Sequence, residues 1–389
     1  TMWCRRLATL ARGHPYRSAC ALLALFACTQ LMINSSLVCS LLFSQRAEPA
    51  IYTPGLPLGG RHIANGTAPT SAAAGSLIDL PLLDGNSSAS LAEADLDPAD
   101  SAASKLPLCP NVPPKLRGLL PKAEILSDPV RSPSWSELAA QFPDVRHGGS
   151  RPADCQARQR VAIVVPFRNR DAHLRLFLAN LVPMLQRQQL HFKVFAIEQA
   201  GTTRFNRAML FNIGFKEAMR LFKPNCFIFH DVDLLPEHDH NMYRCGAHPR
   251  HMSAAVDKFK YRLPYATIFG GACALTPRQF EAINGFSNLF FGWGGEDDDF
   301  ANRVVWSGFK ISRYPLSIAR YTMIKHKTEE KNKPNPMRFK LIKFGKKRWH
   351  SDGLNSLQYT VSRVQDRQLA YFISVEIPES QILRRAKLL

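Results

Sequence analysis

The middle of the chain alternates between short, continuous apolar runs and longer segments in which apolar residues recur every three or four positions. The short runs cover 161–165, 192–197 and 226–229, and the periodic segments between them cover 174–185 and 208–222. Continuous runs of this length are typical of buried strands, and the longer period is typical of amphipathic helices. The pattern therefore predicts a β-α-β-α-β unit with a mainly parallel sheet, and Pro183 is predicted to kink the first helix.

A second pattern lies near the start of the sequence, where no charged side chain occurs between Arg17 and Arg46. The segment 19–43 is long enough to cross a bilayer, which takes about 20 residues. Arginines precede it, so residues 1–18 are predicted to be a cytoplasmic tail. A cleaved signal peptide is disfavoured because the apolar stretch is too long and no small-residue cleavage site follows.

The segment 44–105 is rich in Ala, Ser, Pro, Gly and Asp and has no sustained periodicity. This composition is typical of a flexible stem. Asn65 and Asn86 lie in it within Asn-x-Ser/Thr sequons, and they are predicted glycosylation sites if the stem is lumenal. From residue 106 the composition becomes globular, so 106–389 is expected to be a lumenal catalytic domain.

Charge and cysteine content narrow the class of protein. The 389 residues carry a formal net charge of +19, which favours anionic partners. The basic residues are scattered without a nucleic-acid-binding motif, so a nucleic-acid partner is not expected. Five cysteines lie beyond residue 105, and in an oxidising lumen an odd number leaves at least one unpaired or bonded between chains.

Two acidic elements carry the candidate chemistry. Four consecutive carboxylates at 296–299 follow Trp293 and two glycines, and Asp231 and Asp233 come directly after the third predicted strand. Adjacent carboxylates raise one another's pKa, so such a run is solvated, binds a cation or supplies a base. Ligands of open α/β sheets bind beyond the carboxyl ends of strands, which favours a metal and phosphate site near Asp231 and Asp233.

Three further segments offer binding groups. The segment 166–170 contains two arginines and a phenylalanine, which suit a phosphate and a base, although a solvated basic loop fits equally well. His326 is a candidate metal ligand, whereas residue chemistry alone makes Met323 a core residue. The charged segment 327–336 reads as a mobile loop able to close over substrate. The other histidines match no standard zinc spacing.

Six motifs together resemble the β1,4-galactosyltransferase family of Golgi enzymes over residues 106–376. They are Val-Pro-Phe-Arg-Asn-Arg at 165–170, Phe-Asn-Arg-Ala at 205–208, Asp-Val-Asp at 231–233, Tyr-Arg-Cys at 243–245, Trp-Gly-Gly-Glu-Asp-Asp-Asp at 293–299 and Ser-Asp-Gly-Leu-Asn-Ser-Leu at 351–357. The resemblance implies an α/β fold of GT-A type, manganese (Mn2+) as cofactor, UDP-sugar donors and inverting β1,4 transfer to a terminal GlcNAc. It also implies a single-pass type II protein of the Golgi membrane.

The resemblance also implies roles for individual residues. Asp297 is the general base, Glu296 and Gly271 hold the donor sugar, and the metal ligands are Asp233, Met323 and His326, which overturns the core interpretation of Met323. The UDP site comprises Pro166, Phe167, Arg168, Arg170, Phe205, Asp231, Val232 and Lys258. The acceptor site comprises Tyr265, Trp293, Asp298, Arg338, Phe339 and Ile342. The disulfides are Cys109–Cys155 and Cys226–Cys245, which leaves Cys273 free.

One position departs from the family. The galactose-transferring members have a tyrosine before Phe-Gly-Gly, and here Ile268 stands before Phe269, Gly270 and Gly271. That tyrosine lies near the 2-position of the donor sugar, where it crowds an acetamido group, and isoleucine is shorter and has no hydroxyl. The sequence therefore favours transfer of GalNAc from UDP-GalNAc, giving GalNAcβ1,4GlcNAc on a glycoprotein or glycolipid. The alternatives are a UDP-Gal-dependent β1,4-galactosyltransferase and, in another class, a catalytically silent carbohydrate-binding protein.

Overall fold

The computed structural model describes residues 106–325 and 332–388. The predicted tail, bilayer span and stem, both sequons and His326 lie outside the described residues. Within 106–325 and 332–388, no helix is long and apolar enough to cross a membrane.

A central sheet of eight strands organises the described part of the chain. Its strands are β1 Gly149–Ser150, β2 Arg160–Phe167, β3 His191–Gln199, β4 Cys226–His230, β6 Arg250–His251, β8 Ala272–Leu275, β10 Thr360–Arg367 and β11 Ala370–Glu376. They lie in the order β10-β11-β3-β2-β4-β8-β6, and β1 pairs with β3. The predicted runs correspond to β2, β3 and β4, and the predicted helices to α6 Asp171–Arg187 and α7 Arg207–Leu221, so the β-α-β-α-β unit is confirmed. The helix α6 continues through Pro183.

The sheet is mixed, so the prediction of a mainly parallel sheet was wrong. Only the pairs β2–β3, β2–β4 and β11–β3 are parallel, and the pairs of β1, β6, β8 and β10 are antiparallel. Only two residues connect β10 to β11, a connection that allows antiparallel pairing alone. The strand β8 returns against β4 after the long excursion that carries the Asp231–Asp233 motif.

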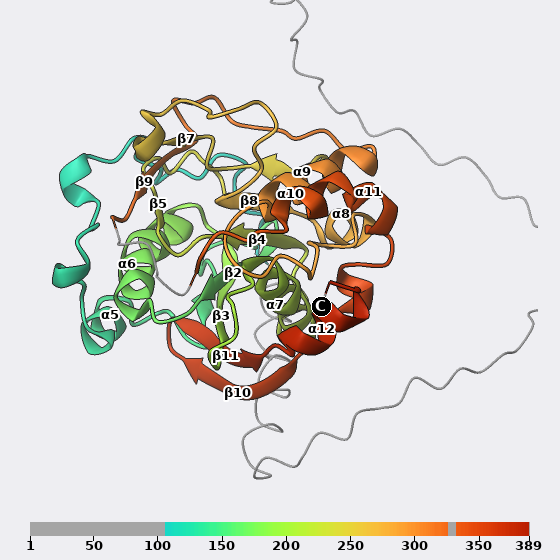
Figure 1. The fold of residues 1–389 in the computed structure, drawn as a ribbon. Coiled ribbons are helices and arrows are strands. Elements are labelled where there is room, and N and C mark those ends of the chain that lie inside the picture. The colour runs from blue at the N-terminus through green and yellow to red at the C-terminus, as the bar shows by residue number, and fades with distance from the viewer. Residues whose placement is uncertain (1–105, 326–331, 389) are drawn as a thin grey trace, which may run out of the picture. The chain divides into compact units, whose positions relative to one another are not determined.

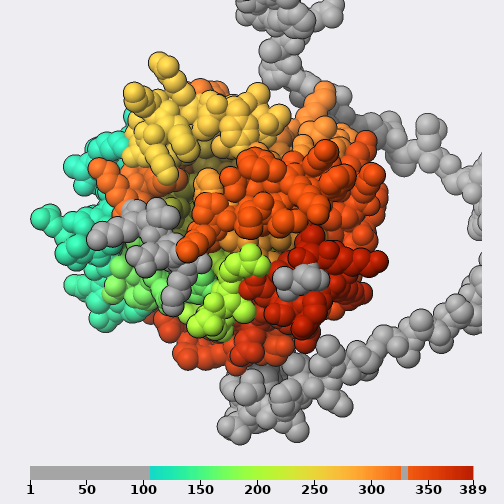
Figure 2. Space-filling model, in the orientation of Figure 1, coloured from blue at the N-terminus to red at the C-terminus, as the bar shows by residue number. Residues whose placement is uncertain are grey.

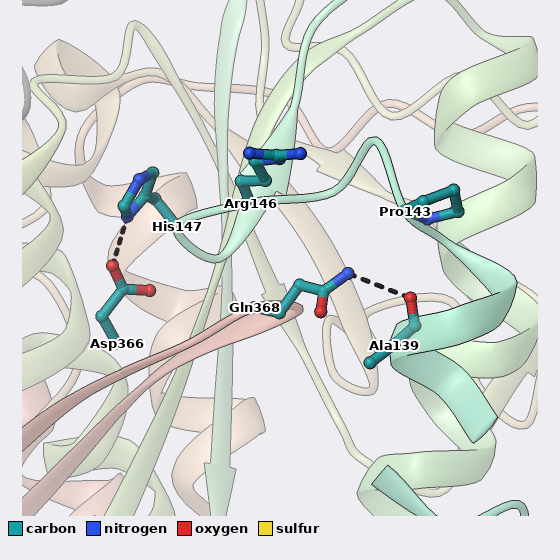
Figure 3. A pocket seen from close by; sticks show the side chains of 6 residues that line it. All are labelled: Ala139, Pro143, Arg146, His147, Asp366 and Gln368. Carbon is teal, nitrogen blue, oxygen red and sulfur yellow. Dashed lines mark hydrogen bonds and ion pairs between the residues drawn. The ribbon is translucent and has the colours of Figure 1, made fainter. Parts of the chain in front are cut away.

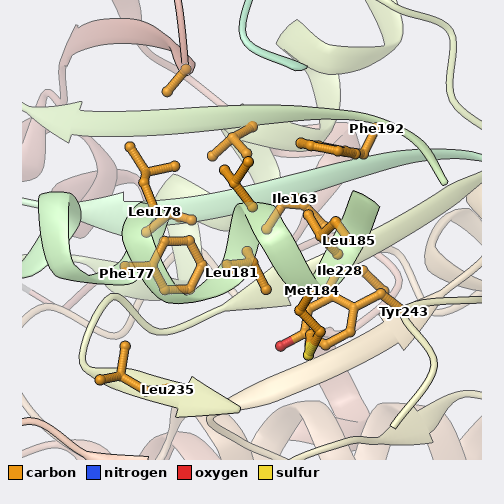
Figure 4. Packing of buried hydrophobic residues seen from close by; sticks show 14 of the residues in the cluster. Ile163, Phe177, Leu178, Leu181, Met184, Leu185, Phe192, Ile228, Leu235 and Tyr243 are labelled. Carbon is orange, nitrogen blue, oxygen red and sulfur yellow. The ribbon is translucent and has the colours of Figure 1, made fainter. Parts of the chain in front are cut away.

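The alternating side chains of β2 serve two cores. Val161, Ile163 and Val165 pack into one cluster with α6 and α5 Trp135–Gln141, and Ala162 and Val164 pack into another with α7. Figure 1 shows α5 and α6 on one side of the strands and α7 on the other. Figure 4 shows side chains of α6 facing Ile163 and Ile228. Because both faces are covered, these strands are apolar at nearly every position.

The second cluster is completed by three more helices. They are α8 Pro277–Ala282, α9 Glu296–Trp306 and α12 Glu379–Arg385. Two short helices, α10 Arg338–Lys343 and α11 Gly345–Arg348, contact α9. The 3-10 turns are η1 Lys122–Glu124, η2 Pro129–Arg131, η3 Asp257–Phe259 and η4 Leu354–Ser356.

A small sheet lies beside the end of β4. It consists of β5 Leu234–Pro236, β9 Arg320–Met323 and β7 Ala255–Val256, in the order β5-β9-β7. Leu234 pairs with Met323, and the Ile324 amide donates to the Asp233 carbonyl at 2.7 Å. This pairing brings Asp233 and Met323, which are 90 positions apart in sequence, to neighbouring places.

Both implied disulfides are confirmed. Cys109 bonds to Cys155 and Cys226 bonds to Cys245, and Cys273 is a free, buried cysteine. The second bond joins the start of β4 to the loop that precedes β6, so it fixes one boundary of the excursion after β4.

The contact of α7 with β2 and β3 yields a stability prediction. An added Cβ at Gly214 would lie 2.2 Å from Val164 Cγ1 and 3.0 Å from Ile197 Cγ1. Alanine normally stabilises a helix by about 1 kcal/mol relative to glycine, but overpacking costs about 1–3 kcal/mol. We expect Gly214→Ala to lower the free energy of unfolding by about 1 kcal/mol or more, measured by urea denaturation. Lys216→Ala, at an exposed position of the same helix, is the control, and a stabilised Gly214→Ala protein would contradict this packing.

Candidate functional site

A cavity of about 250 Å³ opens where β2 and β4 end and where α7 and α9 begin. Its lining contains eleven residues predicted from the sequence, namely Pro166, Phe167, Arg168, Arg170, Phe205, Asp231, Val232, Asp233, Trp293, Glu296 and Asp297. The remaining lining residues are His173, Arg207, Gly292 and Asn332. The topology therefore gathers at one edge of the sheet most of the residues that the sequence indicated.

Arg207 lies at the centre of this acidic site. Its Nε donates to Asp231 Oδ1 at 2.5 Å, and its Nη1 donates to Asp297 Oδ1 at 2.7 Å and lies 3.4 Å from Glu296 Oε1. The planar guanidinium can serve several carboxylates because its donors are fixed in a fork. Burial alone would lower the pKa of Arg207, but Asp231, Asp297 and Glu296 together raise it well above its usual value.

Burial alone would lower the pKa of the Arg207 guanidinium, but it raises the pKa of two carboxylates around it. Burial raises the pKa of Asp231 above the usual carboxyl range even though Arg207 opposes the shift. Burial also raises the pKa of Glu296, and the neighbouring charge of Asp297 raises it further. A cation brought to this edge of the sheet would therefore be favoured, because it would offset the cost of crowding three carboxylates.

The buried His230 side chain holds the backbone of the Asp231–Asp233 segment by a hydrogen bond. Its Nδ1 donates to the Asp231 carbonyl at 2.8 Å, and its Nε2 accepts from the Tyr243 hydroxyl at 2.8 Å. Burial lowers the pKa of His230 to about 4, so the ring is neutral near pH 7. Tyr243 belongs to the Tyr-Arg-Cys motif, which therefore acts here through packing and hydrogen bonds.

The helix α9 distributes its four acidic residues to different partners. Glu296 and Asp297 face Arg207, and Asp298 accepts a hydrogen bond from the Tyr265 hydroxyl at 2.8 Å. Asp299 is fully buried and pairs with Arg303 at 2.7 Å. Successive residues of a helix point in directions about a quarter-turn or more apart, so adjacent acids are separated. The helix N-terminus also favours negative charge.

The residues expected at the acceptor site lie around the start of α9. Trp293 is 62% exposed, and its backbone exchanges hydrogen bonds with Lys333 and Asn335. Added Cβ atoms at Gly294 and Gly295 would lie 3.0–3.4 Å from side-chain atoms of Arg338, and Ile342 also lies close to Gly295. Phe339 is 69% exposed on α10. Figure 2 shows α10 and α11, in orange-red, on the same face of the protein as the yellow segment near residue 260.

Two glycines allow a close approach at the donor side. An added Cβ at Gly270 would lie 2.1 Å from Asp297 Oδ2, and one at Gly271 would lie 2.5 Å from Ser253 Oγ. Gly271 also has a φ of +73°, which side chains rarely adopt. Its carbonyl accepts from the Asp231 amide at 2.8 Å, so the donor-side turn is joined directly to the acidic motif. Ile268 precedes this turn and is half-buried.

The expected metal ligands are described only in part. Asp233 lines the cavity and Met323 lies beside it across the β5–β9 pair, whereas His326 lies outside the described residues. Within 106–325 and 332–388, no three His, Cys, Asp or Glu side chains group as a metal site. Among the described residues, Asp233 supplies a carboxylate, a ligand type that suits manganese, and Met323 lies in the strand paired beside it.

Some of the residues that line the cavity were not given a role from the sequence. Arg207 was visible as part of Phe-Asn-Arg-Ala but received no role, because an arginine's carboxylate partners cannot be read from spacing. Gly292 was noted only as a glycine beside Trp293, and His173 and Asn332 gave no signal. Lys258 is exposed on η3 and Ile268 precedes the turn, and neither is among the residues that line the cavity.

A second and larger cavity, of about 560 Å³, contains none of the expected residues. Its lining comprises Ala139, Pro143, Arg146, His147, Asp366 and Gln368 (Figure 3). His147 Nδ1 lies 2.5 Å from Asp366 Oδ2, and Gln368 donates to the Ala139 carbonyl at 3.1 Å. These polar groups are already paired with one another, so the smaller cavity is the better candidate for chemistry.

Comparisons with known proteins agree with this geometry. A family described as the N-terminal region of glycosyl transferase group 7 matches residues 109–246, and one described as the N-terminal domain of galactosyltransferase matches 250–327. The chain is 48% identical over 278 residues to human beta-1,4-galactosyltransferase 1, covering 71% of this chain and 69% of that protein. It is 49% identical to beta-1,4-galactosyltransferase 3 of Cricetulus griseus, covering 67% of this chain and 65% of that protein.

A solved structure shows the same fold. The catalytic domain of Drosophila beta1,4-galactosyltransferase 7 in complex with xylobiose aligns with a TM-score of 0.51 and 26% identity, covering 59% of this chain and 98% of that chain. A mutant of the same enzyme, solved with manganese, UDP-Gal and xylobiose, aligns with the same TM-score and 25% identity. The fold is therefore that of a GT-A-like glycosyltransferase with a mixed α/β sheet, and the chain belongs to the β1,4-galactosyltransferase family.

Proposed function

We propose that this protein is an inverting glycosyltransferase that transfers GalNAc from UDP-GalNAc to O4 of a terminal GlcNAc. The observation that carries the proposal is the position of Asp297, which lies between Arg207 and Gly270 at the wall of the cavity. Family membership supports sugar transfer, and the donor identity is the finer part of the proposal. The protein would act on glycoproteins or glycolipids as a single-pass type II protein of the Golgi membrane.

The nucleotide would lie against the ends of β2 and β4. Arg168 and Arg170 line the cavity, and the Arg168 guanidinium stacks 5.2 Å over the Phe205 ring. Arg168 also donates to the Thr203 carbonyl at 2.7 Å, which fixes its direction. Fixed guanidinium groups beside an aromatic ring suit a diphosphate and a base. Asp231 and Val232 would contact the same nucleotide.

The metal would be held by Asp233, Met323 and His326. A related Drosophila enzyme was solved with manganese and UDP-Gal, which supports manganese here. When bound, the ion would offset the negative charge that develops on UDP as it departs. Arg168 and Arg170 would bind the same leaving group, so charge at the departing phosphate would be balanced from both sides.

The transfer would need one base and no covalent intermediate. Asp297 would take the proton of the acceptor O4 as that oxygen bonds to the anomeric carbon and the bond to UDP breaks. Attack from the face opposite UDP inverts the anomeric centre. Arg207 holds Asp297 Oδ1 at 2.7 Å, so the second carboxylate oxygen, which lies next to Gly270, would be left to accept the proton. Trp293, Tyr265 and Asp298 would orient the acceptor ring.

The donor preference rests on Ile268. The family resemblance implies a tyrosine at this position in the galactose-transferring members, where its ring and hydroxyl would crowd a 2-acetamido group. Isoleucine leaves volume and an apolar wall for the acetyl methyl. Transfer of galactose from UDP-Gal remains the second candidate, because the relatives aligned with this chain are named galactosyltransferases.

The base assignment yields a first prediction for activity. Asp297→Asn should lower kcat by about 10²–10⁴-fold, because an amide cannot accept the proton. UDP binding measured by calorimetry should survive. Asp298→Ala is the control, and it should mainly raise the acceptor KM because it removes the carboxylate that accepts a hydrogen bond from the Tyr265 hydroxyl.

Two outcomes would contradict this assignment. Near-normal turnover by a folded Asp297→Asn protein would remove Asp297 as the base. Acceptor binding by the wild type without any turnover would favour the carbohydrate-binding protein instead.

The donor assignment yields a second prediction. The wild type should use UDP-GalNAc better than UDP-Gal, and Ile268→Tyr should reverse that order by lowering GalNAc use, because the ring occupies the acetamido volume. A shift of about 1.4 kcal/mol corresponds to a tenfold change in relative kcat/KM. Ile268→Val, which keeps a short aliphatic side chain, should retain the preference. A wild type that already prefers UDP-Gal, or a ratio that Ile268→Tyr does not move, would rule out this residue as the selector.

A further inference from the structure

Residues 265–271, here called the selector segment, run from the expected acceptor side of the site to the expected donor side. Tyr265 at its start donates to Asp298, and Ile268 lies at its middle. Gly270 and Gly271 at its end contact Asp297 and the Asp231 amide. The segment lies outside regular helices and strands, so its shape depends on what holds its backbone.

Arg313 holds that backbone from outside the cavity. Its Nη2 donates to the Ala266 carbonyl at 2.9 Å and to the Ile268 carbonyl at 2.8 Å. The one nitrogen has two hydrogens, so it can bond both carbonyls at once. Arg313 therefore holds the peptide unit before Thr267 and the peptide unit after Ile268, and the Cα atom of Ile268 lies between these two held units.

His251 fixes Arg313 in turn. Arg313 Nε donates to His251 Nδ1 at 3.1 Å, and burial and the Arg313 charge lower the pKa of His251 to about 3. The ring is therefore neutral and can accept this hydrogen bond. His251 is buried, and its amide donates to the Ser312 carbonyl at 2.9 Å, which ties the residue before Arg313 to β6.

The same histidine leads to the end of the selector segment. His251 Nε2 lies 3.4 Å from Ser253 Oγ, which donates to the Gly270 carbonyl at 3.0 Å. Ser253 Oγ also accepts from the Ala272 amide at 2.9 Å. A continuous hydrogen-bond network therefore runs from Arg313 through His251 and Ser253 and reaches the selector segment at both ends. His251 and Ser253 are buried, and hydrogen-bond networks in such places rigidify the backbone around them.

We propose that Arg313 is a positioning residue that sets the shape of the selector segment, and through it both the donor preference and the affinity for the acceptor. It acts through Ile268 and Tyr265, since it is not among the residues that line the cavity. A guanidinium is required because three donors in a rigid fork serve two carbonyls and an imidazole, whereas a lysine ammonium on a flexible stem cannot hold this geometry. The donor part rests on the proposed function.

The test compares Arg313→Met with Arg158→Met in the full chain. Arg158 is a matched control, because its guanidinium Nε also donates to a backbone carbonyl, that of Cys109 at 2.7 Å, far from the selector segment in sequence. Arg313→Met should raise the acceptor KM and change the UDP-GalNAc to UDP-Gal ratio of kcat/KM, each by about tenfold, with a smaller change in kcat. Arg158→Met should leave both quantities unchanged even where it lowers stability.

Arg313→Lys supplies the conservative variant and covers the case in which Arg313→Met does not fold. It should shift both quantities in the same direction and by a smaller factor. An Arg313→Lys or Arg313→Met protein that loses stability as Arg158→Met does, but keeps the wild-type ratio and acceptor KM, would overturn the proposal. If the wild type prefers UDP-Gal, the donor proposal fails, but the acceptor KM still tests Arg313 through Tyr265.

Discussion

The site depends on one cation, the Arg207 guanidinium, which lies among three carboxylates. Asp231, Glu296 and Asp297 come from segments more than 60 positions apart, and without Arg207 their charges would repel at the end of β4. Removing one partner from a buried charge cluster is strongly destabilising, because it leaves charge uncompensated. The same guanidinium fixes Asp297 at 2.7 Å, so the interaction that permits the acidic site also orients its proposed base.

Because residues 296–299 form the first turn of the helix α9, their four acidic side chains point to different partners. As four neighbouring charges in a loop, residues 296–299 would share one environment. As the first turn of a helix, they contact Arg207, Tyr265 and Arg303 in succession. Asp299 is completely buried and also pairs with Arg348. The acidic segment 296–299 therefore connects the cavity to the buried core. Gly295, with a φ of +92°, starts the helix where the chain must turn sharply beside Trp293.

The pattern of apolar residues predicted those helices and strands that depend mainly on nearby sequence. The strands β2, β3 and β4 and the two helices between them follow from continuous and periodic apolar residues, and the disulfides followed from the family resemblance. The directions of β8 and β10 could not be predicted, because strand pairing depends on contacts between residues far apart in sequence. For the same reason Arg207 received no role, although it stands inside a recognised motif. Lys258, to which the resemblance assigns UDP binding, is exposed on η3 and is not among the residues that line the cavity.

In the small sheet and in the selector segment, contacts outside the cavity hold the backbone that carries the site residues. Pairing of β5 with β9 brings Asp233 beside Met323, and Arg313 with Ser253 holds the backbone around Ile268. Neither arrangement is encoded by a motif, since each relies on carbonyl groups that every residue has.

The most direct test of this account is a product analysis with the wild-type protein. The enzyme, manganese and a GlcNAc-terminated acceptor would be incubated with UDP-GalNAc and UDP-Gal at equal concentrations, and the products would be identified by mass and their linkage by NMR. The account predicts that a β1,4-linked GalNAc product predominates. A predominant galactose product would contradict the donor assignment, and an α-linked product or the absence of any product would contradict the proposed inverting transfer itself.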